Sequence, residues 1–305
     1  MKQVLLKVIR NTPVADNVIA MTLEGDVGAI RRPGEFINIK VDGCFLRRPI
    51  SVCDVDTVST GTRRIEKEAQ EAFGVSLYNA PDVSRSKKED PAGIRDKRGG
   101  EGDPEVQGTV TILYKVVGKG TEILAKCRKG DMLDVLTGLG NGFDIGSAGD
   151  APWLIGGGIG SAPMMMLAKH LIEDGVRPTV LLGFRTESEM FLHHDLYEIG
   201  CDVFVATEDG SYGKKGFVID LIREKAESLY CSYIYACGPG PMLKAVHGCI
   251  AGTWPEETPG AELSLEERMG CGFGACMGCS IMTVNGPRRI CKDGPVFKAE
   301  ELVWE

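Results

Sequence analysis

The sequence has little of what several classes of protein require. It contains no run of eighteen apolar residues, so we expect no membrane-spanning helix. Its first residues are charged throughout and include no apolar core or small-residue cleavage site, so we expect no signal peptide. A formal net charge of −8 argues against nucleic acid or an anionic membrane as a partner. We therefore expect a cytoplasmic protein.

Histidine is also scarce, with four residues in the chain. His193 and His194 are adjacent, and we interpret them as surface or cap residues. No arrangement of serine, histidine and carboxylate points to a hydrolytic site. The rest of the composition is ordinary: 305 residues with 43% hydrophobic side chains are enough for two compact domains and a smaller one.

Cysteine, in contrast, is plentiful, and four of the eleven lie close together near the C-terminus. Cys271, Cys276 and Cys279 have the spacing C-x4-C-x2-C, and Cys291 follows after eleven further residues. This is how plant-type ferredoxins supply three of the four thiolates of a 2Fe–2S cluster. Structural zinc is the main alternative, but zinc sites usually come as two separated pairs. Disulfides would need an oxidising compartment. The pattern favours an iron–sulfur cluster.

The first third has the pattern of a small antiparallel β-barrel. Apolar residues recur at every second position over residues 3–24, which predicts two strands with a turn at Thr12-Pro13. Three further strands are expected, over 35–40, 48–53 and 108–117. One helix is expected, at about 120–128. Residues 57–107 are rich in charge, glycine, proline and serine, and we interpret them as a surface loop inserted between neighbouring strands. A docking arm for a partner is the alternative.

Two places in this barrel have the chemistry of a phosphate site. Arg48 offers a bidentate guanidinium, and Ser51 offers a hydroxyl nearby. Thr121 has the position of an N-cap, before a helix whose free N–H groups favour anions. An Arg-Pro-Ser strand is more often simply an edge strand, so the residues alone leave the phosphate role open.

Residues 150–252 alternate strands with helices, which predicts a parallel sheet covered by helices on both faces. A glycine-rich hinge over 137–150 precedes them. The first unit is a strand over 152–155, a turn from Gly156 to Ser161, and a helix over 162–173. This is the context in which glycines let a backbone approach a pyrophosphate. The later strands are expected over 179–184, 201–206 and 232–237, and the helices over 188–199, 216–227 and 239–251.

The nucleotide signal is not the standard dehydrogenase fingerprint. The turn reads GxGxxS, and no acidic residue ends the second strand to hold a ribose. Arg185 follows that strand and leaves the choice between NAD and NADP open. Cys237, at the end of a later strand, is either a buried structural thiol or a neighbour of the nicotinamide ring.

The order of barrel, α/β domain and cysteine segment resembles the ferredoxin-reductase-like flavoproteins, in particular the electron-transfer subunits of class 1B dihydroorotate dehydrogenases. The most specific match is the tail, with the pattern E-R-M-x-C-G-x-G-A-C-x-x-C followed by C-K-D-G-P-V-F. Two features depart from the family pattern: the insertion 57–107, and Lys115, which stands where an arginine is more usual.

The resemblance implies an α+β multidomain chain with three cofactor sites. An FAD-binding antiparallel barrel would span 1–145, an NAD-binding parallel-sheet domain 150–252, and a 2Fe–2S segment 260–305. FAD would contact Arg48, Pro49, Ile50, Ser51, Leu113, Tyr114, Lys115, Gly120 and Thr121. NAD, with NADP not excluded, would contact Gly156, Gly157, Gly158, Gly160, Cys237, Gly238 and Pro239. The cluster ligands would be Cys271, Cys276, Cys279 and Cys291.

The implied function is that of an oxidoreductase subunit whose chemistry is carried by cofactors. Electrons would pass from an FMN-containing dihydroorotate dehydrogenase catalytic subunit, through the cluster and FAD, to NAD+ in the de novo synthesis of the pyrimidine UMP. The two subunits would form a heterotetramer with two copies of each. The alternative is a reductase subunit of a ferredoxin:NADP or sulfide dehydrogenase type complex. A zinc-bearing adaptor that binds a nucleotide without redox chemistry is a third hypothesis.

Overall fold

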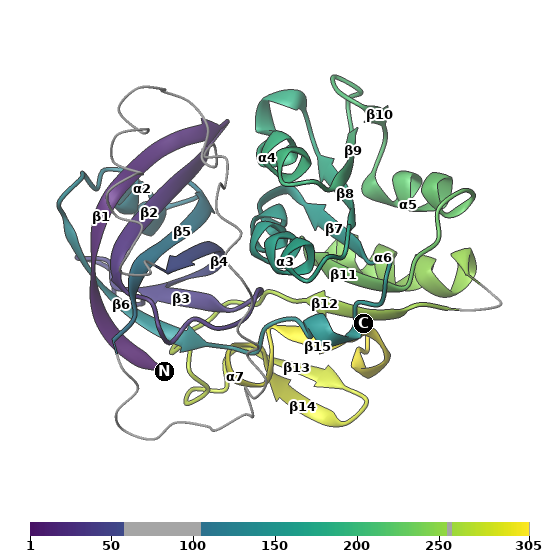
Figure 1. The fold of residues 1–305 in the computed structure, drawn as a ribbon. Coiled ribbons are helices and arrows are strands. Elements are labelled where there is room, and N and C mark those ends of the chain that lie inside the picture. The colour runs from purple at the N-terminus through teal and green to yellow at the C-terminus, as the bar shows by residue number, and fades with distance from the viewer. Residues whose placement is uncertain (58–104, 255–257, 305) are drawn as a thin grey trace.

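The computed structural model describes residues 1–57, 105–254 and 258–304. It places a barrel beside an α/β domain, with the C-terminal segment along the lower side of both (Figure 1). The expected insertion 57–107 lies outside the described residues except at its ends. Those ends lie in neighbouring strands, as predicted, because Thr57 pairs with Gly108. No helix within the described ranges is long and apolar enough to cross a membrane.

The predicted barrel is confirmed and closes in the strand order β1-β2-β5-β4-β3-β6, with every pair antiparallel. Its strands are β1 (Lys2–Ala15), β2 (Val18–Asp26), β3 (Phe36–Ile39), β4 (Arg48–Thr57), β5 (Gln107–Lys115) and β6 (Met132–Leu139). Alternate side chains such as Leu6, Val8, Ile37 and Ile39 fill the interior. The short helix α2 (Lys119–Leu124) packs Leu124 into the same interior.

Two details of the barrel differ from the prediction. Thr12 and Pro13 lie inside β1, and the chain turns instead at Asp16-Asn17, where Asn17 adopts a φ of 58° that asparagine tolerates better than most residues. The prediction also omits β6. Val135 packs into the barrel while Leu136 packs outside it, so apolar residues on both faces hide the alternation of this strand.

The α/β domain is built on a sheet with the strand order β10-β9-β8-β7-β11-β12-β15. Its parallel strands are β7 (Trp153–Gly157), β8 (Thr179–Phe184), β9 (Asp202–Thr207), β10 (Lys214–Lys215), β11 (Tyr233–Cys237) and β12 (Gly260–Ser264). The helices are α3 (Ala162–Glu173), α4 (His193–Glu198), α5 (Val218–Ala226) and α6 (Gly240–Thr253). Both β8 and α3 have the predicted bounds. Short 3-10 turns are Ile145–Ser147, Gly158–Ser161 and Glu187–Glu189.

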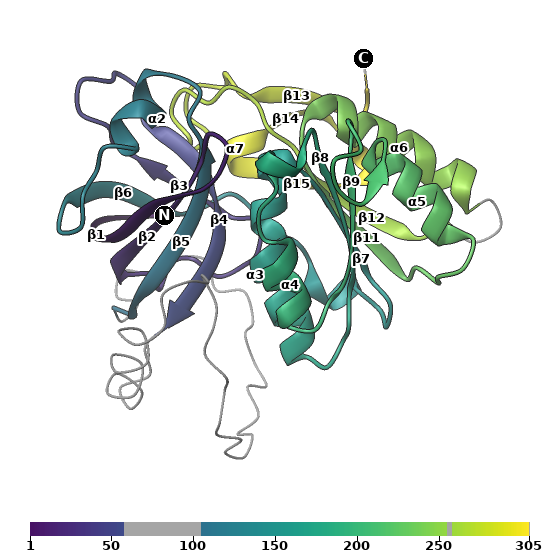
Figure 2. The same cartoon turned by 90° about the horizontal axis from the view of Figure 1, so that it is seen from above.

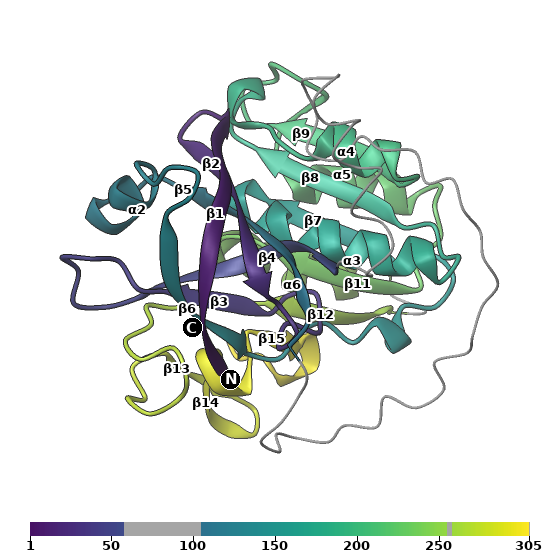
Figure 3. The same cartoon turned by 60° about the vertical axis from the view of Figure 1, so that its left-hand side comes forward.

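The C-terminal segment leaves this sheet and returns to it. After β12 the chain forms the cysteine loop, the hairpin β13 (Ser280–Thr283) and β14 (Gly286–Arg289), and the helix α7 (Ile290–Asp293). It then re-enters as β15 (Val296–Lys298), antiparallel to β12, and continues into a 3-10 turn (Ala299–Glu301). Figures 1 and 3 both show this segment against the barrel and the sheet. The segment expected over 260–305 is therefore tied into the sheet at both ends.

Helix α3 connects the barrel to the α/β domain. Figure 2 shows α3 and α4 on one face of the sheet, and α5 and α6 on the other, with α3 next to β4. At this boundary Lys169 of α3 donates to the Asp54 carboxylate of β4 at 2.5 Å. Burial raises the pKa of Asp54, and the Lys169 ammonium partly offsets that rise. The buried pair therefore fixes how the two domains meet.

We expect Lys169→Met to destabilise the protein by about 3–5 kcal/mol, because it keeps the aliphatic stem but leaves the Asp54 carboxylate buried without its cation. Urea denaturation at neutral pH measures the change. The matched control is Arg177→Met, since Arg177 pairs with Asp202 at 2.5 Å but is 64% exposed. That change should cost less than about 1 kcal/mol. Equal losses for the two variants would contradict this account of the domain boundary.

Candidate functional site

The four cysteines of the C-terminal segment are brought together as two pairs. The Sγ atoms of Cys279 and Cys291 lie 3.2 Å apart. Cys271 and Cys276 exchange contacts: the Cys276 N–H donates to Cys271 Sγ at 3.4 Å, and the Cys271 N–H donates to Cys276 Sγ at 3.5 Å. The pair of Cys279 and Cys291 is buried, whereas Cys276 is exposed and Cys271 is half-buried. The four cysteines expected as ligands therefore form two pairs, and the pair of Cys279 and Cys291 joins the two ends of the hairpin.

The spacing of the buried pair is close to that of two thiolates on one metal. Two thiolates at about 2.3 Å from one tetrahedral metal lie just under 4 Å apart, which is close to the spacing of Cys279 and Cys291. Among the described residues, no three His, Cys, Asp or Glu side chains converge on one point as a mononuclear zinc site would need. Paired thiolates are what a cluster with more than one iron would use.

The backbone of the loop favours thiolate at its exposed end. Burial alone would raise the pKa of Cys271, but N–H groups of Cys276, Phe273 and Ala275 outweigh it and lower that pKa to about 6. The Ala275 N–H lies 3.2 Å from Cys271 Sγ. Gly272 and Gly274, with φ of 78° and 90°, let the loop wrap inward so that these groups point at sulfur. In the buried pair, burial raises the pKa of Cys291 to about 12, so a metal is needed to hold that thiol as thiolate.

Arg289 fastens the cysteine loop to α7. Its Nε donates to Asp293 Oδ2 at 3.0 Å, and its Nη1 donates to the Gly274 carbonyl at 3.0 Å. The contact with Asp293 lowers the pKa of that carboxyl. Sequence reasoning missed this clamp, although Arg289 and Asp293 stand four apart with opposite charges, which is the spacing of an ion pair across one helical turn.

The cysteine loop also contacts the barrel directly. The Asn38 Nδ2 of β3 donates to the Cys271 carbonyl at 3.2 Å. A Cβ on Gly272 would lie 2.3 Å from the same nitrogen, so this approach requires glycine. Asn38 pairs with Pro49 of β4, in the segment expected to hold a flavin. Sequence reasoning missed Asn38 too; the available signal was one polar residue in the apolar stretch of Phe36 to Ile39.

The residues expected at FAD meet only in part. Arg48 lies against α2, where a Cβ on Gly120 would come within 2.0 Å of its Nε, so these two expected segments are adjacent. Thr121 is not the N-cap as expected; the cap is Gly118, and the Thr121 hydroxyl accepts the Gly118 N–H at 3.3 Å from inside the helix. The Thr121 hydroxyl caps the short helix through its hydrogen bonds with the Gly118 backbone. Few hydrogen bonds from this hydroxyl are then left for a ligand.

Three of the other expected flavin residues have buried side chains. Ile50 packs in the barrel interior, and so does Tyr114, whose hydroxyl donates to Asn11 Oδ1 at 3.1 Å. Leu113 packs into the core shared with the α/β domain. Lys115 reaches across the domain boundary to Glu189, at 3.2 Å. The side chains of Ile50, Leu113 and Tyr114 are therefore part of the cores around β4 and β5, while Arg48, Pro49, Ser51 and Lys115 are only partly buried. Contact of all these residues with FAD stays a prediction.

The glycines expected at the nucleotide come together at the carboxyl ends of β7 and β11. A Cβ on Gly160 would lie 2.6 Å from the Cys237 carbonyl, and one on Gly157 would lie 2.1 Å from Met242 Sδ. This close packing leaves no room for a side chain at either glycine. Ser161 is fully buried, and its Oγ has no hydrogen-bond partner within the described residues. A free hydroxyl beside a glycine turn fits a bound pyrophosphate.

Cys237 lies at the same edge and is 8% exposed. Burial raises its pKa to about 12, offset slightly by a hydrogen bond with Ser264. The thiol is therefore neutral and is no nucleophile. Its position is consistent with both sequence-based interpretations, because it is buried and also borders the glycine turn.

Comparisons with known proteins match two parts of the chain to family models. The family model described as the iron-sulfur cluster binding domain of dihydroorotate dehydrogenase B matches residues 266–303, and that of an oxidoreductase NAD-binding domain matches residues 154–248. The chain is 37% identical to the electron transfer subunit of dihydroorotate dehydrogenase B (NAD(+)) from Geobacillus sp. strain WCH70, over 99% of both proteins. It is 35% identical to that subunit from Listeria innocua, again over 99% of both.

Solved structures show the same architecture. A structure of an NADH-dependent reduced ferredoxin-NADP oxidoreductase, reported for flavin-based electron bifurcation, is similar with a TM-score of 0.73 and 26% identity, covering 99% of this chain and 90% of that one. Phthalate dioxygenase reductase has a TM-score of 0.58 at 18% identity, covering 88% of this chain and 70% of that one, and supports the fold alone.

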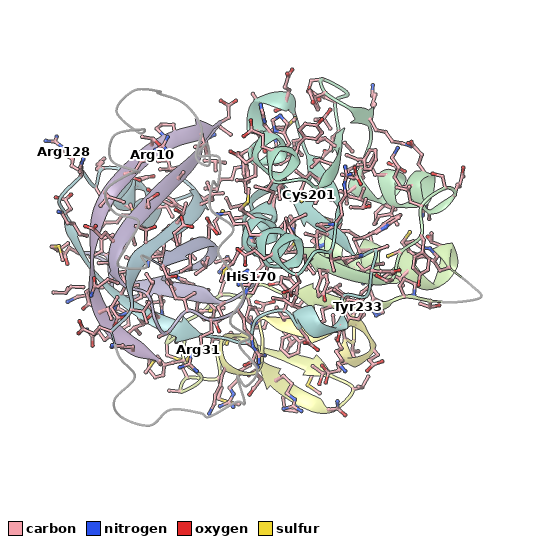
Figure 4. All side chains as sticks on the ribbon, in the orientation of Figure 1. Arg10, Arg31, Arg128, His170, Cys201 and Tyr233 are labelled. Carbon is pink, nitrogen blue, oxygen red and sulfur yellow. The ribbon has the colours of Figure 1, made fainter. Side chains whose placement is uncertain are left out.

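We expect Cys291→Ser to lower the iron bound per chain by roughly tenfold or more, because the buried pair would lose one of its two expected ligands. Iron analysis of anaerobically purified protein measures it. The control is Cys201→Ala: Cys201 is also buried, but it lies next to β9 in the α/β domain (Figure 4). Its iron content should match the unmodified chain. Unchanged iron in the Cys291 variant would show that the paired cysteines are not the site.

Proposed function

Because this chain belongs to the family of dihydroorotate dehydrogenase B electron transfer subunits, we propose that it carries electrons from an FMN-containing catalytic subunit, through a 2Fe–2S cluster and FAD, to NAD+. The chain is an oxidoreductase subunit of the NAD-dependent enzyme. The overall reaction, oxidation of dihydroorotate to orotate, belongs to de novo synthesis of UMP. A cytoplasmic location stays a prediction.

One observation carries the proposal: the cysteine loop, the Arg48–Ser51 strand and the glycine turns lie around one junction of the fold. Asn38 of β3 donates a hydrogen bond to Cys271 in the loop and pairs with Pro49 of the neighbouring strand β4. Helix α3 begins at the nucleotide turn and also packs against β4. When bound, a flavin exchanges single electrons with a cluster and a hydride with nicotinamide. A chain that gathers these three sites is suited to connect the two kinds of transfer.

The pairing of the thiols supports a cluster of two irons. Cys271 with Cys276 would bind one iron, and Cys279 with Cys291 the other, which matches the ferredoxin-like spacing of the four residues. The N–H groups aimed at sulfur stabilise negative charge there. Metal binding would also deprotonate the buried Cys291, whose own pKa is raised.

FAD is proposed to lie on the outer face of β4, between the barrel and the α/β domain. Arg48, beside the start of α2, would bind the pyrophosphate through its planar guanidinium. Ser51 lies on the same outward face as Pro49, since side chains alternate along a strand. Lys115 is held by Glu189 and would give a point charge rather than a bidentate contact.

NAD is proposed to bind at the carboxyl ends of the sheet, with its phosphates on the Gly156–Ser161 turn. The fully buried Ser161 hydroxyl and the close packing of Gly157 and Gly160 support this. The proposed nicotinamide site borders Cys237, so a neutral thiol would face the ring. Arg185 is 71% exposed and lies 3.9 Å from Glu189, so NADP stays an open alternative to NAD.

The catalytic subunit is proposed to dock on the exposed end of the cysteine loop. Cys276 is exposed there, and its neighbours Phe273 and Met277 are 44% and 53% exposed. Apolar side chains on the surface beside an electron-carrying group are typical of a protein interface. Two copies of each subunit would then form the heterotetramer.

A reductase subunit for another partner, of ferredoxin:NADP or sulfide dehydrogenase type, is the alternative. The likeness to the solved ferredoxin-NADP oxidoreductase structure favours a shared fold at 26% identity. The match of residues 266–303 to the dihydroorotate dehydrogenase B cluster domain supports the first proposal, because this segment would face the partner.

Anaerobic titration of the purified chain with NADH should bleach both flavin and iron–sulfur bands in the visible spectrum. Both respond because nicotinamide, flavin and cluster would be connected within one chain. A flavin that bleaches without any cluster band would contradict the electron-relay proposal. A colourless, flavin-free preparation would instead support the zinc-bearing adaptor.

The isolated chain should not oxidise dihydroorotate, because no described site outside the cofactor regions offers the chemistry for it. Adding an FMN-containing dihydroorotate dehydrogenase subunit should produce NADH from dihydroorotate and NAD+, followed at the nicotinamide absorbance. Turnover of dihydroorotate by this chain alone would contradict the assignment of catalysis to the partner subunit.

A further inference from the structure

Asn38 is a buried polar residue in an otherwise apolar strand. Asn38 is only 1% exposed. Its neighbours Ile37 and Ile39 are also buried, and their side chains lie in the barrel interior. Because side chains alternate along a strand, Asn38 and Phe36 point out of the barrel instead. Phe36 packs there in the same apolar cluster as Cys279 and Cys291. Asn38 therefore lies between the barrel wall and the cluster-binding segment.

The amide nitrogen of Asn38 holds the cysteine loop. Nδ2 donates to the Cys271 carbonyl at 3.2 Å, and the backbone of Gly272 comes so close that a Cβ would lie 2.3 Å from that nitrogen. This is a direct hydrogen bond between a barrel strand and the residue that begins the cluster motif. Asn38 thus sets where the loop stands on the barrel.

The amide oxygen of Asn38 has no such partner. Oδ1 is buried, and none of the described residues donates a hydrogen bond to it. Buried acceptors normally have a hydrogen-bond partner, so an acceptor without one beside a proposed binding site indicates that a ligand supplies the donor. Its cross-strand neighbour is Pro49, which has no N–H to give, and Pro49 belongs to the strand proposed to hold FAD. A flavin carries suitable donors at N3–H and at its ribityl hydroxyls.

We propose that Asn38 is a positioning residue that joins the cluster loop to the bound flavin. Nδ2 binds the Cys271 carbonyl, and Oδ1 accepts a hydrogen bond from the flavin. One rigid side chain then sets the spacing and orientation of the two electron carriers. The inference rests on the proposed function, since it requires that FAD binds beside Pro49.

The test uses Asn38→Leu, which keeps the size of the side chain but removes both hydrogen-bonding groups. FAD is titrated into deflavinated protein and followed by flavin fluorescence. The variant should bind FAD about ten- to a hundredfold more weakly, because a flavin donor is left unpaired in a buried site. The cluster of the deflavinated variant, reduced with dithionite, should also show a changed electron paramagnetic resonance spectrum, because the Cys271 carbonyl loses its donor.

Asn141→Leu is the matched control. Asn141 also donates from Nδ2 to a backbone carbonyl of the cluster segment, that of Asp293 at 3.0 Å. It is exposed, however, and forms an isolated bridge with Pro295 rather than pairing with the strand proposed to bind FAD. Its FAD affinity should equal that of the unmodified chain. Thermal unfolding of both variants shows whether either one fails to fold.

Flavin analogues separate a hydrogen bond from general damage. FAD analogues that lack one donor, N3-methyl-FAD or FAD lacking a ribityl hydroxyl, are titrated into the unmodified chain and into Asn38→Leu. The analogue that lacks the donor bonded to Asn38 should bind the unmodified chain more weakly than FAD does. The Asn38→Leu variant should bind this analogue and FAD with equal affinity. Strictly additive losses for every analogue, or an Asn38 variant that binds FAD like the control, would overturn the inference while leaving FAD binding intact. Absence of any flavin binding by the unmodified chain would instead overturn the proposed function.

Discussion

The return of the chain into the parallel sheet is the constraint on which the cysteine site depends. β15 pairs with β12, and the Leu265 N–H donates to the Pro295 carbonyl at 2.9 Å, so both ends of the intervening segment are anchored at one place. A loop that would hold four thiolates is thereby closed before any metal binds. Closing it on a sheet strand reduces the entropy that the metal would otherwise have to offset. The two pairs of cysteines then form from residues five and twelve positions apart in sequence.

The same anchoring sets the cluster segment against the barrel. The Asn141 N–H donates to the Gly294 carbonyl at 2.6 Å, and the Asn38 amide donates to the Cys271 carbonyl. The cysteine segment therefore contacts the barrel both near its beginning and near its end. A cluster held this way would keep its distance from β4, the strand proposed to bind FAD.

The nucleotide side is placed independently, through α3. The helix begins at the glycine turn and carries Lys169, the partner of Asp54, in its second half. Lys115 and Glu189 form a second ion pair between the domains. Buried charges are costly unless paired, so these contacts favour one relative orientation of barrel and sheet. The proposed crevice for two dinucleotides thus has a wall from each domain.

Local patterns in the sequence were enough for much of this architecture. The run of apolar residues before the glycine turn predicts β7, and the bounds of β8 and α3 match the expectation, because strong periodicity and clear glycine turns surround them. β6, β12 and β15 were beyond such reasoning. β6 is apolar on both faces, and β12 and β15 form a sheet edge from residues that read as the flanks of a metal loop.

The sequence by itself determined which chemistry is present: the spacing of Cys271, Cys276 and Cys279 predicts the cluster, and the glycines after β7 predict the nucleotide turn. Only the tertiary structure decided how these parts meet. It put Thr121 inside a helix rather than at its cap, turned Tyr114 into the barrel, and brought Asn38 to Cys271 across more than two hundred residues. The reason is physical, since spacing along the chain records ligand types, while contacts between distant strands depend on which faces can be buried together.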